Sequence, residues 1–330
     1  MAGIPCQPFS IERVGRQKGM ADYRGARLWT RTAELFAAAG AQVVVVENVD
    51  EAVKAAGTEG AAIFAAHGFP CFHCQTVAAS DYGSAQVRRR MWATYSRRPL
   101  TWEPAGPAPG PRPVRDFLLK TEEFEEEAWD AGEARALRGT LEPCYLGGRH
   151  LRMLIEKRVH EESNFGLAAV PVWQDLPVGA FTRNYWKGGG SAPLLVDRCL
   201  GCGYQVEPHE DWLYLTDDDC DEEDLRFPAH LVCGACREDL YSDLGDLTPG
   251  TMHDWLVERW AAGATSVRRF HPREIARMFG LPDVWPLPEK PGPATRLLGN
   301  SLHVDTAVAV LQGVEAAMLG QTVQHLALAI

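Results

Sequence analysis

A continuous run of β-branched residues, Val43 to Val46, is the feature that most limits what this chain can fold into. Such a run is typical of a strand buried on both faces in a parallel sheet. A helical pattern from Arg31 to Ala39, ended by Gly40, precedes the run, and a second from Asp50 to Ala56 follows it. The order helix, buried strand, helix predicts the α/β class.

Several further elements follow from local patterns. Residues 87 to 95 are compatible with a strand that carries arginines at alternate positions, and Pro and Gly fill the linker at 103–113. The sequence is irregular from there to about residue 264. Residues 272 to 280 then predict a helix, with Pro in its first turn and Gly at its end. Residues 305 to 330 predict an amphipathic or buried helix, and its polar residues argue against a membrane anchor: Glu315, Gln321 and Gln324.

The chain is acidic overall, but the acid is local. Its 330 residues are 46% apolar, enough for a buried core, and the formal charge is −11. Residues 122–133 hold seven carboxylates and residues 207–224 hold ten; without these 17 the charge becomes +6. We expect each acidic segment to be a solvated loop or helix face, because like charges repel one another. Five arginines lie close together in the sequence and could form either a solvated face or an anion-binding surface. They are Arg88, Arg89, Arg90, Arg97 and Arg98.

Six of the nine cysteines lie in C-x-x-C pairs. The N-terminus has no basic or apolar signal region, so we expect an intracellular protein, cytoplasmic or nuclear, in which metal or catalytic thiols are favoured over disulfides. Two pairs could hold a structural zinc ion tetrahedrally; the alternative is four reduced thiols without metal. These two pairs are Cys199 with Cys202 and Cys233 with Cys236. We expect the isolated pair, Cys71 and Cys74, to be unliganded.

Four short motifs carry candidate chemistry. Cys6, in Pro-Cys-Gln, could be a nucleophile or a buried, inert thiol. Glu47 and Asn48 directly follow the apolar strand, where ligands of open α/β sheets bind, so Glu47 is either an acid/base group or a carboxylate near a helix N-cap. Strand alternation places Gln86, Arg88 and Arg90 on one face. Gly299-Asn300-Ser301 is predicted to open the final helix.

The order of these motifs resembles the cytosine-C5 methyltransferase family. Pro-Cys-Gln, Glu-Asn-Val, Gln-x-Arg-x-Arg and Gly-Asn-Ser follow one another with a variable segment before the last. Residues 270–282 and 296–302 look like the branch that modifies cytosine-38 in the anticodon loop of aspartate tRNA. So do Cys6-Gln-Pro-Phe and the Phe181-Thr182 element. The resemblance covers residues 1 to about 100 and 265 to 315 well and is patchy between them.

The resemblance implies a role for each matching residue. Cys6 would be the nucleophile that adds to cytosine C6, Glu47 would hold the cytosine edge, and Arg88 and Arg90 would fix the active-site loop and the base oxygen or phosphate. Further substrate contacts would come from Gln7, Asn48, Phe181 and Thr182. The methyl donor would be S-adenosylmethionine, contacted by Asn300 and Ser301.

The sequence departs from the family in three places, one of which is the presence of the two C-x-x-C pairs predicted to bind zinc. No Gly-rich loop or acidic residue for the methyl donor stands before Cys6, so we expect a partial Rossmann-like methyltransferase sheet without its N-terminal strands. A truncated gene model or alternative start is preferred over an enzyme completed by a second polypeptide, and the activity of this chain on its own is left open. Ala180 stands where the branch usually has Cys, and a thiol near the target base is therefore absent.

The expected architecture is a methyltransferase core interrupted by an irregular target-recognition domain. Residues 1–102 form part of the core, 103–113 the linker, 114–264 the recognition domain with a zinc knuckle at 199–236, and 265–330 the return to the core. We expect a monomer that acts on tRNA, without membrane attachment. Methylation of DNA is one alternative, and an inactive truncated chain that binds zinc, with or without RNA, is the other.

Overall fold

The structure, a computed structural model, divides the chain into two compact units. The first comprises residues 1–111 and 302–330, and the second comprises residues 112–301. The first division lies inside the expected linker, and the chain returns to the first unit at residue 302, whereas the sequence analysis placed the return at 265. The structure describes residues 1–5, 9, 23–106, 108–119, 169–171, 178–183, 185–187, 193–196 and 267–320.

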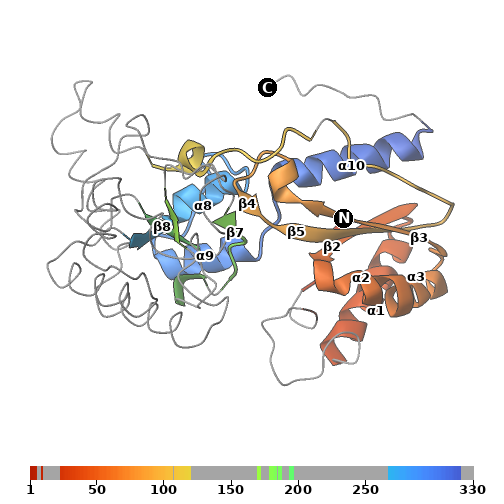
Figure 1. Cartoon of the computed structure of the whole chain (residues 1–330). Helices are drawn as coiled ribbons and strands as arrows, with labels where there is room; N and C mark the ends of the chain where they lie inside the picture. The colour runs from red at the N-terminus through yellow and green to blue at the C-terminus, as the bar shows by residue number, and fades with distance from the viewer. Residues whose placement is uncertain are drawn as a thin grey trace, which may run out of the picture. The chain divides into compact units, whose positions relative to one another are not determined.

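A four-stranded sheet with the order β1-β2-β5-β3 forms the centre of the first unit (Figure 1). Strand β2 runs parallel to β1 on one side and antiparallel to β5 on the other, and β5 is also antiparallel to β3. The valine run is therefore an inner strand, as predicted, but only one of its two neighbours is parallel. The strands are β1 (Ala2–Gly3), β2 (Val43–Val49), β3 (Cys71–Ala78) and β5 (Arg89–Ser96).

Both faces of β2 are buried. Val44 and Val46 are fully buried in one apolar cluster, together with Trp29 and Phe64. Val45, on the opposite face, lies in a second cluster with residues of α10 (Val304–Met318). Figure 1 shows α10 on one side of the sheet and the other helices of the unit on the opposite side. The latter are α1 (Tyr23–Ala38), α2 (Val53–Ala55) and α3 (Ala61–Ala66), with the turns η2 (Asp50–Ala52) and η3 (Ala56–Gly60) between β2 and α3.

The helix ends follow local sequence signals. The helix before the valine run, α1, extends further toward the N-terminus than predicted and ends just before Gly40, whose φ is +71°. This left-handed conformation is favourable for glycine because it has no Cβ. Of the final predicted helix, 304–318 are helical and residues 321–330 lie outside the described range. Within the described part of the chain, no helix combines the length and apolarity that a membrane span requires.

The predicted strand over residues 87 to 95 is interrupted at Arg88. Short strand β4 (Gln86–Val87) precedes the break, and β5 begins one residue after it. The Arg88 N–H donates to the Gln86 carbonyl at 3.0 Å, and the Arg88 carbonyl accepts from the Ala79 N–H at 2.9 Å, in the turn η4 (Ala79–Asp81). Burial still alternates across this break, because Gln86 and Arg88 are buried whereas Val87 and Arg89 are exposed.

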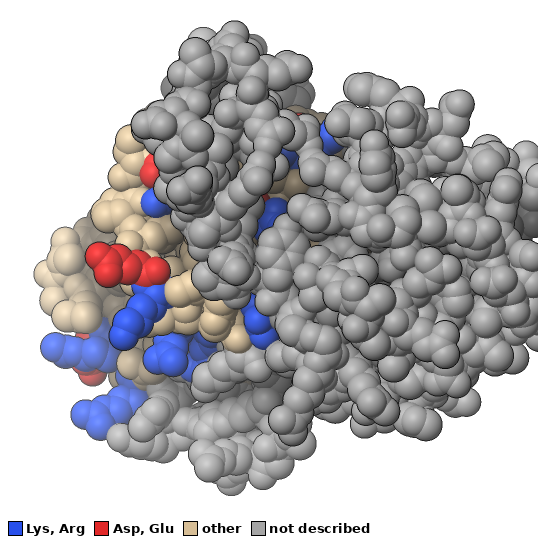
Figure 2. All heavy atoms as spheres, turned by 90° about the vertical axis from the view of Figure 1, so that its left-hand side faces the viewer, with Lys and Arg blue, Asp and Glu red and all other residues tan. Residues whose placement is uncertain are grey.

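The described part of the second unit contains a small sheet and two short α-helices. Its strand order is β6-β8-β9, with β6 parallel and β9 antiparallel to β8. Lys and Arg outnumber Asp and Glu among its described residues. Figure 2 shows basic side chains gathered on part of one face of the molecule. The elements are η5 (Val114–Phe117), β6 (Ala169–Pro171), β7 (Val178–Gly179), η8 (Tyr185–Lys187), β8 (Leu194–Val196), β9 (Val267–Arg269), α8 (Pro272–Met278) and α9 (Pro291–Gly299).

Helix α8 confirms the helix predicted from residue 272. His271 caps its first turn, because the His271 ring nitrogen Nδ1 accepts from the Arg273 N–H at 3.1 Å. Glu274 completes the capping box by accepting from the His271 N–H at 2.7 Å. Gly280, with φ of +73°, follows the helix at its other end.

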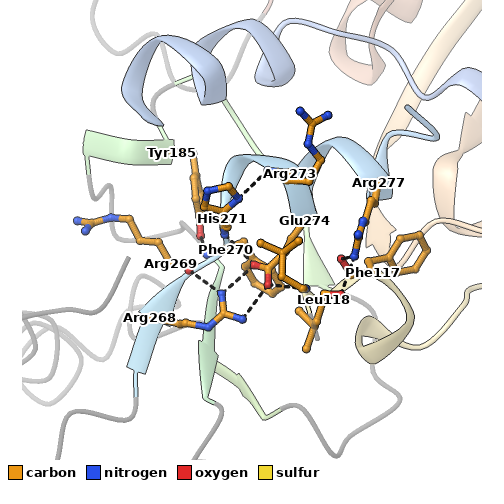
Figure 3. Close-up of polar contacts among 11 residues, drawn as sticks. Phe117, Leu118, Tyr185, Arg268, Arg269, Phe270, His271, Arg273, Glu274 and Arg277 are labelled. Carbon is orange, nitrogen blue, oxygen red and sulfur yellow. Dashed lines mark hydrogen bonds and ion pairs between the residues drawn. The ribbon is translucent and has the colours of Figure 1, made fainter. Parts of the chain in front are cut away.

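A buried ion pair between Arg268 and Glu274 organises the second unit (Figure 3). The two guanidinium nitrogens donate to the two carboxylate oxygens at 2.8 and 2.9 Å. Glu274 Oε1 also accepts from the Leu119 N–H at 3.0 Å, and Arg277 donates to the Leu118 carbonyl at 2.7 Å. These contacts hold the segment that follows the linker against α8. The phenolic oxygen of Tyr185 accepts from the Phe270 N–H at 2.7 Å and ties η8 to β9.

Replacing Glu274 by Ala should lower the unfolding free energy of the second unit by about 3–5 kcal/mol, because Arg268 would be left buried without a counter-charge. Urea denaturation followed by near-UV circular dichroism measures the change. Asp283→Asn is the control: it removes an exposed ion pair with Arg277 and should cost about 0–1 kcal/mol. Equal losses in the two variants would contradict the importance of the buried pair.

Candidate active site

Polar residues begin where β2 leaves the core of the first unit. Glu47 and Asn48 follow the buried valines within the same strand, and Glu47 lies opposite Trp92 of β5 and beside Gly3 of β1. Since successive residues of a strand point to opposite faces, Glu47 shares its face with Val45, which is the face covered by α10. The sheet therefore fixes a carboxyl group at the end of a rigid, inner strand.

Glu47 forms an ion pair with Arg90. The distance between Arg90 Nε and Glu47 Oε1 is 3.2 Å, and the two side chains are only 18% and 14% exposed. Burial raises the pKa of the Glu47 carboxyl above its ordinary value, while the positive charges of Arg90 and Arg88 offset part of this rise. A carboxyl group with a raised pKa can keep a proton nearer to neutral pH and donate it to a bound ligand.

Asn48 connects the end of β2 to the chain that leads to Cys6. Its amide nitrogen donates to the Ile4 carbonyl at 3.1 Å, and its amide oxygen accepts from the Val49 N–H at 2.8 Å. Asn48 is 1% exposed, so both groups are satisfied within the protein. Ile4 lies two residues before Cys6 in the sequence. Cys6 and Gln7 themselves lie outside the described residues.

The five clustered arginines do not share one environment. Arg88 is 3% exposed, and Arg89 pairs with Asp50 at 3.1 Å on the surface. Arg97 donates to a backbone carbonyl beyond the other end of β5 and lies over the Phe69 ring. Six strand residues, 91 to 96, separate Arg90 from Arg97 by about 23 Å, so the two groups do not form a continuous anion-binding surface. Only Arg88 and Arg90 lie with Glu47.

His303, a buried histidine at the start of α10, was not among the residues predicted from the sequence. Its ring nitrogen Nδ1 accepts from the Thr306 N–H at 3.3 Å and lies 2.9 Å from the Thr306 hydroxyl, so it caps the helix. Burial lowers the pKa of His303 to about 4; Asp305 opposes this shift and Arg88 adds to it. The sequence signal that could have indicated this cap is a polar residue three positions before Thr306, close to the Gly-Asn-Ser motif.

The remaining candidate residues lie in the second unit. Phe181 is 1% exposed and packs edge-on against Tyr185 and Phe270, with ring centroids 5.1 and 5.2 Å away. Its side chain is therefore part of the core, whereas Thr182 and Ala180 are half-buried. The prediction that Gly-Asn-Ser opens the final helix is wrong. Gly299 is the last residue of α9, and Asn300 is its C-cap.

Asn300 and Ser301 are held by the end of α9. Their backbone N–H groups donate to the Leu297 and Leu298 carbonyls at 3.2 and 2.8 Å, and the Ser301 hydroxyl donates to the Leu297 carbonyl at 3.0 Å. The Asn300 side chain is exposed. Its amide can both donate and accept hydrogen bonds, which fits a contact with the polar groups of a small cofactor.

The four cysteines predicted to bind zinc lie outside the described residues: Cys199, Cys202, Cys233 and Cys236. Within the described ranges, no group of three or more His, Cys, Asp and Glu side chains is placed to hold a metal ion. Cys71 and Cys74 are free thiols in β3, and burial raises the pKa of Cys74 to about 11.

Together, the partial sheet with helices on both faces and polar residues at the end of an inner strand define the fold of an S-adenosylmethionine-dependent methyltransferase. The chain belongs to the C-5 cytosine-specific DNA methylase family, whose family model matches residues 1–165 and 241–316. The reaction of this family is methylation of cytosine at C5, and the methyl donor that the family implies is S-adenosylmethionine.

Two solved structures share the fold at low sequence identity. The crystal structure of a mutant DNMT2 from Spodoptera frugiperda is 17% identical, with a TM-score of 0.53, and the match covers 94% of this chain and 77% of that one. The methyltransferase EhMeth from Entamoeba histolytica is 14% identical, with a TM-score of 0.55, and the match covers 96% and 76%. A comparison with curated protein sequences found no match.

The stability of the first unit should fall as the pH is lowered from 6.5 to 4. An unfolded histidine binds a proton below about pH 6.5, whereas His303 in the fold stays neutral down to about pH 4. The unfolded state therefore binds more protons in this window, and about 3 kcal/mol present above pH 6.5 is lost as the pH reaches 4.

His303→Asn tests this origin, because the Asn oxygen can still cap α10 but does not titrate. Thermal unfolding at several pH values should show a shallower acid loss in the variant and little difference from the parent protein at pH 8. Identical acid losses in the two proteins would assign the effect to other groups.

Proposed function

We propose that this chain methylates C5 of a cytosine in a tRNA anticodon loop, of the cytosine-38 type, through a covalent bond between Cys6 and cytosine C6. The observation that supports this most is the position of Glu47: a buried carboxyl paired with Arg90, at the end of the strand to which Asn48 ties the segment leading to Cys6. A nucleophile and an acid/base group would then act on one ring.

The chemistry requires these two groups because cytosine C5 does not take a methyl group directly. The Cys6 thiolate would add to C6, and the electron pair of the C5–C6 bond would make C5 nucleophilic. S-adenosylmethionine supplies the methyl group, carried on a sulfonium. Loss of the C5 proton to a base would then re-form the double bond and release the Cys6 thiolate.

Glu47 would act on the opposite edge of the base. Its protonated carboxyl can donate to N3 and its other oxygen can accept from the N4 amino group, which offsets the charge that develops when the thiolate adds. The raised pKa of Glu47 supports this role, because a carboxyl that keeps its proton is available as a donor. Arg90 would orient the carboxyl, and Arg88 would contact the base oxygen or the active-site loop.

A tRNA substrate is supported by the sequence around Phe181-Thr182 and by residues 270–282, which resemble the tRNA-modifying branch. The base of a structured loop must swing out to reach the nucleophile, and the backbone phosphates then need basic partners. The excess of Lys and Arg among the described residues of the second unit is consistent with such contacts (Figure 2). We propose that Thr182 contacts the target side and that the exposed Asn300 contacts the methyl donor.

DNA is the second candidate substrate, because the family model that matches the chain is that of DNA methylases. Transfer of a labelled methyl group to an aspartate tRNA transcript and to duplex DNA separates the two. The proposal expects label in the tRNA, and label in the DNA alone would overturn it.

Cys6→Ala should reduce methyl transfer to the background level, because no thiolate remains to activate C5. RNA containing 5-fluorocytosine should form a denaturant-resistant complex with the parent protein but not with the variant. Cys71→Ala is the control, since Cys71 pairs with Ser96 at the opposite end of β5 from Arg90. Full activity without Cys6 would refute the assigned nucleophile.

Glu47→Gln should lower kcat on the order of 10²–10⁴-fold, with a smaller effect on KM, because general acid catalysis would be lost. In the parent protein the rate should fall as the pH rises through the raised pKa of Glu47. Arg90→Met should move this fall to higher pH, because it removes a positive charge that lowers the pKa. A pH profile unchanged by either substitution would contradict the role of Glu47.

We further propose a structural zinc ion held by Cys199, Cys202, Cys233 and Cys236, on the strength of their spacing. Elemental analysis after anaerobic purification should give one zinc per chain, and Cys233→Ser should release it. A metal content near zero in the parent protein would exclude the ion.

A further inference from the structure

The end of α9 meets the segment around Thr182 without a side chain between them. A Cβ atom added at Gly299 would lie 2.3 Å from the Arg183 backbone nitrogen and 2.3 Å from the Thr182 carbonyl carbon. Contacts this short are not tolerated, and both obstructing atoms belong to the backbone, which cannot move aside as a flexible side chain can. Only glycine allows the two backbones to approach this closely.

Each segment is also anchored on its other side. The residues after Gly299 are hydrogen-bonded to the last turn of α9, through Leu297 and Leu298. The Thr182 carbonyl accepts from the Tyr185 N–H at 3.0 Å, and the Tyr185 ring is fully buried. A shift of either segment therefore has little room to be absorbed locally and presses on the other.

We infer that Gly299 is a positioning residue that couples binding of the methyl donor to binding of the target nucleic acid. The inference rests on the proposed function, in which Asn300 and Ser301 contact the donor and Thr182 contacts the nucleic acid. The donor segment begins at Asn300, the residue after Gly299, and the Thr182 backbone occupies the space that a Cβ at Gly299 would need. Because coupling between two sites is reciprocal, each ligand should change the affinity of the other by the same factor.

The experiment compares Gly299→Ala with Gly292→Ala. Both glycines lie in α9, but a Cβ at Gly292 would meet only the edge of Trp186, at 3.8 Å, which is an ordinary contact. Calorimetry gives the affinity for S-adenosylhomocysteine with and without saturating aspartate tRNA transcript. The parent protein and Gly292→Ala should show a change on the order of 5- to 150-fold, and Gly299→Ala a change within about twofold of none.

Hydrogen exchange on the parent protein provides a second test that needs no variant. S-adenosylhomocysteine should slow exchange in the peptide around Thr182–Arg183, and tRNA should slow exchange around residues 297–301. These changes are local and would not follow from a general gain in stability alone.

Three outcomes would overturn the inference. Two ligands that bind the parent protein independently would sink the coupling while leaving the proposed function intact. Undiminished coupling in a folded Gly299→Ala protein would remove the role of Gly299. A parent chain that binds neither ligand would overturn both the inference and the proposed function, and is recognised by the absence of any heat signal.

Discussion

Burial of β2 on both faces is the constraint on which the first unit depends. With apolar clusters against both sides of Val44, Val45 and Val46, polar groups can appear only where the strand leaves the core. Glu47 stands at that boundary, so its carboxyl is largely desolvated and the charged form is disfavoured. The antiparallel register, which pairs Arg90 with Val49, delivers the compensating charge from the neighbouring strand. The burial of β2 therefore both builds the apolar core and raises the pKa of the Glu47 carboxyl.

The second unit depends on a different interaction, because its described strands are at most three residues long. Its buried ion pair joins Arg268 and Glu274 to the Leu119 backbone, which lies 155 residues earlier in the chain than Glu274. A buried ion pair is no strong source of net stability, but a partner lost from it is expensive. We therefore regard the pair as a device that selects one arrangement of distant segments over others.

Much of this could be predicted from local sequence. The valine strand, the helix that starts at residue 272 and the end of α1 before Gly40 follow from patterns that local physics enforces. Glu47 could be found because a strand end in an α/β sheet is where ligands bind. The break at Arg88 and the antiparallel partner of β2 could not, since both depend on which segments pair across the sheet. His303 escaped notice because a histidine is an uncommon helix cap.

Tertiary contacts also give different roles to neighbouring residues of a single sequence motif. Within Gly-Asn-Ser, Gly299 serves backbone packing, Asn300 points to solvent, and Ser301 is bonded back to the helix. Gly313 of α10 provides a parallel case in the first unit, since its added Cβ would lie 1.9 Å from the Glu103 carbonyl oxygen at the start of the linker. A glycine in the interior of a helix lowers the stability of that helix by roughly 1 kcal/mol relative to alanine. Helix α10 therefore has a weaker backbone at Gly313 in return for a contact that no other residue permits. In α9 the glycine is the last residue of the helix, and its contact lies next to the proposed donor site.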